Sequence, residues 1–218
     1  MILIRRLAAP SGLLAKKDEW TERWVNGCPA DWATHEARSL LQVSLPALTY
    51  GKCCYCESIL DCDKEKFIEV EHYHAKTVRQ ELVFEWTNLF PVCRVCNGSK
   101  RDQDHGGRLL KPDKDNGEDL FWLEGHTGEL QPLSPDCAER ALATIQICKL
   151  NRATLCRERQ RLFQTTSRLL QASRQWDDGM TLEFKALLHP TTEHKLAVRS
   201  ALPGGLADVD RRIYHAAD

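Results

Sequence analysis

The stretch that decides the fold runs from residue 53 to residue 100. It opens with Cys53-Cys-Tyr-Cys-Glu57 and closes with Cys93-Arg-Val-Cys-Asn-Gly-Ser-Lys100. Each end carries two cysteines separated by two residues, and this spacing lets both sulfurs of a tight turn face one ion. Two such turns complete the tetrahedron of thiolates that zinc prefers. The sequence therefore predicts a structural zinc ion, and its expected ligands are Cys53, Cys56, Cys93 and Cys96.

The chain has ten cysteines in all. A disulfide framework is disfavoured, because the chain is larger than the small secreted domains that depend on one and we see no export signal. Cys54 and Cys62 are close enough in sequence to be alternative zinc ligands, but they lack the matching spacing. The remaining cysteines are interpreted as small buried hydrophobic residues: Cys28, Cys137, Cys148 and Cys156.

Two residues between the cysteine pairs carry hydrolytic chemistry, namely Glu71 and His72. A histidine near the end of a strand is by itself more often a packed or solvent-facing residue than a catalyst. Asn97, directly after the last cysteine, changes the interpretation. The carboxylate of Glu71 and the amide oxygen of Asn97 are hard donors suited to Mg²⁺ or Mn²⁺, and imidazole can deprotonate water near neutral pH. The combination predicts a hydrolytic metal site with His72 as the general base.

The pattern predicts an α+β protein that is mostly helical. We expect a helical region over residues 1–48, a core over 49–112, and a hairpin and helical region over 113–218. In the first region, Trp20, Trp24 and Val25 form one expected apolar face, and Ala37, Leu40, Leu41 and Val43 form another. In the core, residues 67–73 alternate as a strand, with Ile68 and Val70 against Glu69 and Glu71, and a short helix is expected to reach Lys100.

The third region is expected to begin with a hairpin whose tip is Glu124-Gly-His-Thr-Gly128. Ser134-Pro135-Asp136 is typical of a helix start, with the serine as cap, and this helix is expected to reach about residue 150. Residues 151–173 form an amphipathic pattern. Six positive residues with one negative residue, Glu158, make that area a candidate phosphate-facing or partner-facing surface, although a solvated helix face explains it as well: Lys149, Arg152, Arg157, Arg159, Arg161 and Arg168.

Composition limits the functional classes. The 218 residues are 42% hydrophobic, which indicates a globular protein, and 30 basic against 31 acidic residues offer no general attraction for nucleic acid. Any such affinity must come from local patches or from a partner. The short apolar run at Met1 precedes Arg5 and Arg6 and lacks the length of a signal peptide or membrane span, so we expect a cytoplasmic protein.

These motifs together resemble an HNH endonuclease of the zinc-stapled type. The resemblance is carried in order by Cys53–Glu57, Val70-Glu-His-Tyr-His-Ala-Lys76, Trp86-Thr-Asn-Leu89 and Cys93–Lys100. It implies a ββα-metal core flanked by N-terminal and C-terminal helices. It also implies that Glu71 and Asn97 hold a catalytic Mg²⁺ or Mn²⁺, that His72 is the general base, and that Asn88 fixes the loop positioning it.

The flanks are similar to the nuclease subunits of Septu anti-phage systems, the PtuB-like HNH proteins that also accompany some retrons. This wider likeness includes Pro10–Trp24, Leu109–Pro112, Gly128–Pro132 and Thr144–Arg152, with Arg157 beyond. It implies a hetero-oligomer with an ATPase of the ABC or SMC-like class (PtuA-like), in which the partner senses infection and this chain cuts.

The chain departs from the family pattern after His72, where an arginine and a proline are common and His74 and Ala75 stand here. His74 is a candidate phosphate contact, or an exposed strand residue, and Lys76 is nearby. Lys100 and Arg101 are candidates to steady the cleaved phosphate, although solvated cations at helix ends are common. His105 is a further possible neighbour of the site.

Two alternatives stay open. One is a ribonuclease that cuts transfer RNA, as the retron-linked relatives suggest, since nothing in these residues separates DNA from RNA. The other is a non-catalytic zinc-knuckle module that binds nucleic acid or protein, in which Glu71, His72 and Asn97 are bystanders.

Overall fold

The computed structural model describes residues 1, 3–27, 35–60, 68–103, 105–171, 178–189 and 192–201. Several expectations lie outside these residues: the burial of Cys28, the alternative ligand Cys62, and the first residue of the expected strand at Phe67. None of the described helices is long and apolar enough to cross a membrane.

The predicted N-terminal helices are confirmed as α1 (Ser11–Val25) and α2 (His35–Ala47). Trp20 and Leu41 are buried, as expected. Val25 and Val43 are wrongly assigned to the apolar faces, since they are 50% and 79% exposed. A helix turns about 100° per residue, so Val25 lies about 140° from Trp20 and Val43 about 160° from Leu41 around their helices.

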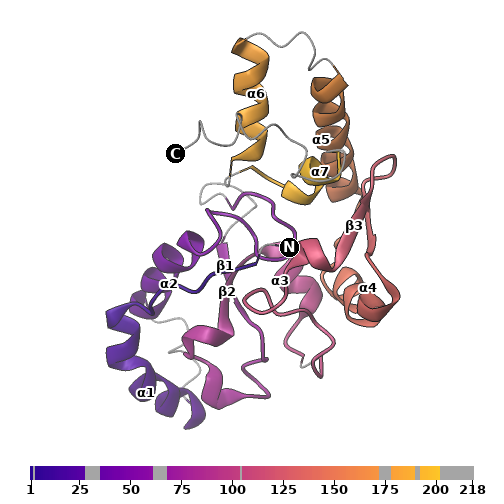
Figure 1. The fold of residues 1–218 in the computed structure, drawn as a ribbon. Helices are drawn as coiled ribbons and strands as arrows, with labels where there is room; N and C mark the ends of the chain where they lie inside the picture. The colour runs from indigo at the N-terminus through magenta and orange to yellow at the C-terminus, as the bar shows by residue number, and fades with distance from the viewer. Residues whose placement is uncertain are drawn as a thin grey trace.

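The central unit is a two-stranded antiparallel sheet followed at once by a helix. β1 (Ile68–His72) pairs with β2 (Leu89–Cys93), and α3 (Arg94–Lys100) begins directly after β2. Helix α2 contacts both strands, and Figure 1 draws it on the left of the sheet with α3 on the right. The order of two strands and a helix is the one that the sequence predicts.

The burial pattern of β1 differs from the simple alternation that the sequence predicts. Glu71 and His72, at the end of the strand, are only 2% and 6% exposed, whereas Ile68 and Val70 are half-buried. The reason is tertiary. The last residue of α3, Lys100, extends back onto the end of β1 and donates a 2.9 Å hydrogen bond to the carbonyl of His72.

The predicted hairpin is confirmed as β3 (Phe121–Glu124) and β4 (Glu129–Pro132). At Gly128, where φ is 75°, a Cβ would collide with the backbone of Cys156, so the tip needs glycine to lie this close to the following helix. The other helices are α4 (Ala138–Ile147), α5 (Ala153–Gln171), α6 (Asp178–Leu188) and α7 (Lys195–Ser200). Short 3₁₀ turns cover Gln80–Leu82, Trp86–Asn88, Gly117–Asp119 and Pro135–Cys137.

Four details of this region correct the sequence-based expectations. Ser134 makes no capping hydrogen bond, and α4 ends at residue 147 rather than about 150. Cys137 is half-buried rather than buried, whereas Cys148 and Cys156 are buried as expected. Arg159 is no part of a basic surface: it is 3% exposed and donates to the carbonyls of Gly128 and Leu150.

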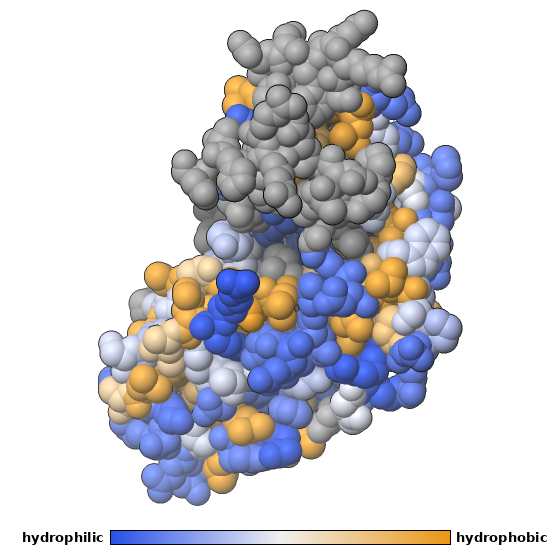
Figure 2. All heavy atoms as spheres, in the orientation of Figure 1, coloured by the Kyte–Doolittle hydropathy of each residue, from blue (hydrophilic) through white to orange (hydrophobic). Residues whose placement is uncertain are grey.

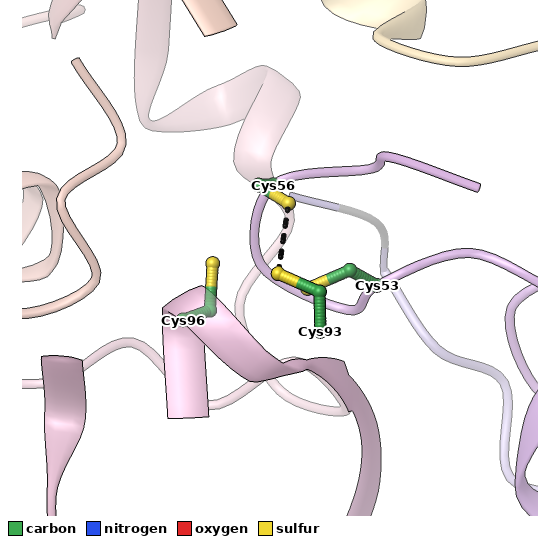
Figure 3. A group of neighbouring side chains, drawn as sticks. All are labelled: Cys53, Cys56, Cys93 and Cys96. Carbon is green, nitrogen blue, oxygen red and sulfur yellow. Dashed lines mark hydrogen bonds between the residues drawn. The ribbon is translucent and has the colours of Figure 1, made fainter. Parts of the chain in front are cut away.

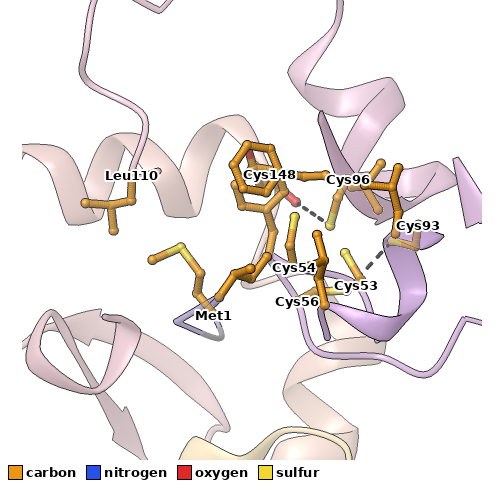
Figure 4. Packing of buried hydrophobic residues seen from close by; sticks show 14 of the residues in the cluster. Met1, Cys53, Cys54, Cys56, Cys93, Cys96, Leu110 and Cys148 are labelled. Atoms are coloured by element: carbon orange, nitrogen blue, oxygen red, sulfur yellow. Dashed lines mark hydrogen bonds between the residues drawn. The ribbon is translucent and has the colours of Figure 1, made fainter. Parts of the chain in front are cut away.

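The buried core is continuous through all three expected regions and includes Leu13, Leu41, Phe90, Leu130 and Leu155. Figure 4 shows the cysteines of both pairs packed within it, near Met1, Leu110 and Cys148. On the face shown in Figure 2, hydrophobic and hydrophilic residues are mixed over the coloured part of the surface. The division at residues 48 and 112 remains a prediction.

Arg6 joins the N-terminal segment to the start of β2. Its guanidinium donates to the carbonyls of Trp86, Thr87 and Leu89, forms a 3.0 Å ion pair with Asp113, and lies 4.1 Å from the ring centroid of Phe90. The fork of an arginine suits such a set of acceptors. Arg6 therefore holds the turn that leads into the second strand.

We expect Arg6→Ala to lower the free energy of unfolding by about 3 kcal/mol, because it leaves buried carbonyls and the Asp113 carboxylate without their donor. Thermal or urea unfolding followed by circular dichroism measures this change. The exposed neighbour Arg5 provides the matched control, and Arg5→Ala should change stability little. Equal stabilities of the two variants would contradict the assigned role of Arg6.

Candidate functional site

Local backbone hydrogen bonds place the first cysteine pair. A bridge between Lys52 and Ile59 closes the turn, the amide of Cys53 donates to the carbonyl of Ser58 at 2.9 Å, and the amide of Glu57 returns to the carbonyl of Cys53 at 3.0 Å. Glu57 has a φ of 65°, which permits the tight reversal after the second cysteine. Both sulfurs are thereby turned toward the central unit.

The second pair lies where strand becomes helix. Cys93 is the last residue of β2 and precedes α3, and Cys96 lies in the first turn of that helix. The amide of Cys54 donates to the carbonyl of Pro91 at 3.0 Å and joins the two turns. Figure 3 shows the four side chains facing a common space.

The four sulfurs fit a tetrahedral zinc ion. They lie within 4.8 Å of one another and are buried, and Cys56 and Cys93 are 3.7 Å apart. A Zn–S distance of about 2.3 Å requires tetrahedral edges of about 3.8 Å. The predicted four-cysteine group is therefore confirmed as a possible metal site. Cys54 is buried but stands outside this group.

Without an ion the four thiols compete for protons. Burial raises the pKa of the Cys53 thiol well above its ordinary value, whereas hydrogen bonds from the other three sulfurs hold the pKa of Cys56 well below it. Zinc binds thiolates, so loading the group must release protons.

Arg152, which the sequence suggested as part of a surface patch, contacts this group. Its two terminal nitrogens lie 3.7 Å from the sulfur of Cys96 and 3.6 Å from that of Cys56. Burial by itself lowers the pKa of Arg152, but the charge of Cys56 and Cys96 outweighs it and leaves the pKa above the ordinary value. Since four thiolates around one Zn²⁺ carry a net charge of −2, a guanidinium here offsets half of it.

We expect Cys93→Ser to lose zinc and to unfold the central unit, because the binding energy of a structural zinc ion is also folding energy. Elemental analysis of the purified protein and a thermal melt provide the readouts. Cys137→Ser, outside the four-cysteine group, is the control and should keep both properties. Retained zinc together with an unchanged melting temperature would refute the structural-zinc assignment.

Arg152→Gln should weaken zinc binding by about 10- to 100-fold, the range typical of residues that hydrogen-bond to metal ligands. Competition with a chromogenic chelator measures it without any reference to activity. Arg157→Gln removes an exposed charge from α5, which begins directly after Arg152, and should release zinc as the unaltered protein does. Identical release by both variants would show that the Arg152 contact is incidental.

A polar pocket of about 290 Å³ lies beside the four-cysteine group, between β1 and α3. Most of the candidate catalytic residues line it. Its walls are formed by Glu69, Val70, Glu71, His72, Lys76, Arg94, Asn97, Gly98, Lys100, Arg101 and Asp102.

His72 is held as a neutral imidazole. Its Nε2 lies 3.0 Å from the carbonyl of Val83, and because a carbonyl can only accept, Nε2 carries the ring proton. Nδ1 is then the nitrogen that can accept a proton. Burial lowers the pKa of His72 to about 3, with the charge of Lys76 acting in the same direction, so the ring stays uncharged at neutral pH.

Glu71 and Lys100 form a buried ion pair, with 2.8 Å between Nζ and Oε1 and side chains that are 2% and 1% exposed. The contact lacks the angles of a directed hydrogen bond, and Oε1 accepts none. Burial raises the pKa of Glu71 to about 7 although the Lys100 ammonium opposes it. Lys100 is thus no solvated cation at a helix end; it is the buried partner of Glu71.

Asn97 is oriented by Glu69, which accepts a 2.7 Å hydrogen bond from its Nδ2. This directs the amide nitrogen to a carboxylate and leaves the amide oxygen as the donor suited to a hard cation. Among the described residues, the four cysteines are the one set of three or more His, Cys, Asp or Glu ligand atoms lying close together. Glu71 and the amide oxygen of Asn97 are hard oxygen donors in the pocket, and Mg²⁺ typically takes one or two protein carboxylates and completes its shell with other oxygens.

Asn88 and the two further histidines lie outside the pocket lining. Asn88 is buried; its side chain accepts from the amide of His74 and donates to the carbonyls of His74 and Leu82, which ties the segment after β1 to the turn before β2. His74 packs edge-on against Tyr73, and His105 Nε2 lies 3.2 Å from the carbonyl of Lys100. Lys76 and the exposed Arg101 do line the pocket.

Four charged residues of the pocket or the metal group were missed as site residues: Glu69, Arg94, Asp102 and Arg152. Glu69 had a usable signal, because it stands two positions before Glu71 and so on the same face of the strand. Asp102 had a similar signal, because it directly follows the candidate residue Arg101. Arg152 had no local signal, because its contact with the sulfurs comes from a distant part of the chain.

Fold and site define the class: an α+β protein with a four-cysteine metal-binding group beside a buried, charged pocket. No protein-family model matches the chain. The chain is similar to the Septu protein PtuB of Bacillus thuringiensis, with 33% identity over 104 residues, which are 48% of this chain and 38% of PtuB. The chain thus spans about two fifths of the length of this curated relative. The expected PtuB-like resemblance is confirmed over that part.

Proposed function

We propose that the chain is a metal-dependent HNH-type endonuclease that hydrolyses phosphodiester bonds of nucleic acid, with DNA favoured. The observation that carries the proposal is the neutral, buried His72 in one pocket with Glu71 and Asn97, beside the four-cysteine group. A positioned base and hard oxygen donors in one pocket are what hydrolysis of a diester requires.

His72 acts on the attacking water in this proposal. The hydrogen bond from Nε2 to Val83 fixes the ring, so Nδ1 receives the proton of the water. A low pKa keeps the base unprotonated but makes it weak, and the water must become more acidic before it gives up its proton.

Glu71 and the amide oxygen of Asn97 would hold Mg²⁺ or Mn²⁺. The bound ion would acidify water and neutralise charge on the scissile phosphate and the leaving 3′-oxygen. Glu69 keeps the Asn97 amide in its orientation. Lys100 balances the charge of Glu71 within the protein, so the phosphate contacts fall to Lys76 and Arg101, which line the same pocket.

The biological role follows from the similarity to PtuB. We propose an effector subunit of a Septu-type anti-phage system that acts in the cytoplasm as a hetero-oligomer with an ATPase of the ABC or SMC-like class. The near-zero net charge agrees with a division of labour in which the partner contributes to nucleic-acid capture.

His72→Ala should abolish cleavage while the protein stays folded, because the base is lost and the zinc group is untouched. The assay offers plasmid DNA and total transfer RNA to the purified chain with Mg²⁺ or Mn²⁺, with and without the ATPase. His126→Ala, at the exposed tip of the hairpin, is the control and should cut as the unaltered protein does.

Nucleic-acid cleavage by His72→Ala at the rate of the unaltered protein would contradict the role of His72 as general base. Cutting of transfer RNA alone would identify a ribonuclease. Metal-independent binding without cleavage in any arm would instead identify a zinc-knuckle binding module.

A further inference from the structure

A second pocket, of about 230 Å³, adjoins the pocket that holds His72. The two share four lining residues, so they form one continuous groove: Glu69, Val70, Lys76 and Asn97. The second pocket is bounded on its other side by α2, through Arg38, Leu41 and Gln42. Helix α2 thus forms the outer wall of the groove.

The second pocket has the chemistry of a nucleotide subsite. The half-buried Ile68 and Val70, backed by the buried Leu41, supply an apolar surface against which the face of a base or a sugar can pack. Arg38 is exposed on α2, and its guanidinium is the group best suited to a phosphate oxygen. Gln42 beside it offers both a hydrogen-bond donor and an acceptor.

The charge of the groove differs from that of the chain. Five cationic and three anionic side chains line the two pockets together: Arg38, Lys76, Arg94, Lys100 and Arg101 against Glu69, Glu71 and Asp102. Because Lys100 and Glu71 neutralise each other, four cations face two anions. A chain with 31 acidic and 30 basic residues thus concentrates positive charge along this groove.

We propose that the pocket between α2 and β1 binds the nucleotide next to the scissile phosphate, with Arg38 contacting the adjoining backbone phosphate and Gln42 the base or sugar. This rests on the proposed nuclease function. Arg38 and Gln42 then position a polynucleotide and take no part in bond breaking. A small phosphodiester without flanking nucleotides does not reach them.

The test compares hydrolysis of a polynucleotide with hydrolysis of bis(p-nitrophenyl) phosphate by the 218-residue chain. Arg38→Ala should lower kcat/KM for the polynucleotide by about tenfold, chiefly through KM, because a charge-assisted contact is lost. Hydrolysis of the small diester should stay unchanged. Arg23→Ala removes the same charge from the exposed face of α1, outside the groove, and should alter neither activity.

A binding arm separates this inference from the function it rests on. In a His72→Ala background, a fluorescent oligonucleotide should bind about tenfold more weakly when Arg38 is also replaced, and the slope of log affinity against log salt should fall by about one. Gln42→Ala should weaken binding with no change of that slope.

If the unaltered chain binds the oligonucleotide but cuts no substrate, the nuclease proposal fails. The effect of Arg38→Ala on oligonucleotide binding then still tests whether the pocket between α2 and β1 binds a nucleotide. Unchanged binding and cleavage in Arg38→Ala, an equal loss on both substrates, or no oligonucleotide binding at all would overturn the subsite.

Discussion

The junction at which the four sulfurs meet is the constraint on which the central unit depends. Cys93 ends β2 and precedes α3, so the position of its sulfur sets the start of the helix that carries Asn97 and Lys100. Zinc in small knuckles contributes about 10 to 16 kcal/mol, as much as the whole stability of a typical domain, about 5 to 15 kcal/mol. A zinc ion bound by these four sulfurs would stabilise a pocket whose own buried charges are unfavourable.

The buried charges of the pocket destabilise the folded protein. Burying Glu71 and Lys100 removes both from water, and the attraction within a buried ion pair rarely offsets the full desolvation free energy. Below about pH 6.5, keeping the buried His72 uncharged destabilises the folded state further, because the same imidazole is protonated in the unfolded chain. Functional sites often contain charged groups with strongly shifted pKa values. At such sites the rest of the fold stabilises the protein enough to offset the unfavourable burial.

The sequence predicted those features that depend on local spacing. The two Cys-x-x-Cys pairs predicted the four-cysteine group, and turn residues predicted the hairpin of β3 and β4. Exposure was predicted less well. Val25 and Val43 were placed on buried faces and are exposed, because each lies on the far side of its helix from the buried residues. Arg159 was placed on a surface and is buried, because burial depends on which neighbouring segment covers a face.

Sequence alone therefore determined the four-cysteine ligand set and the order of strand, strand and helix. It also led us to propose His72 as base and Glu71 and Asn97 as hard donors. Only the tertiary structure decided that Lys100 pairs with Glu71, that Glu69 orients Asn97, that Arg152 reaches the sulfurs, and that α2 walls the groove. The physical reason is the sequence separation of the interacting residues. The spacing of residues along the chain controls geometry within a turn or two, whereas contacts between distant segments form only when the buried core packs.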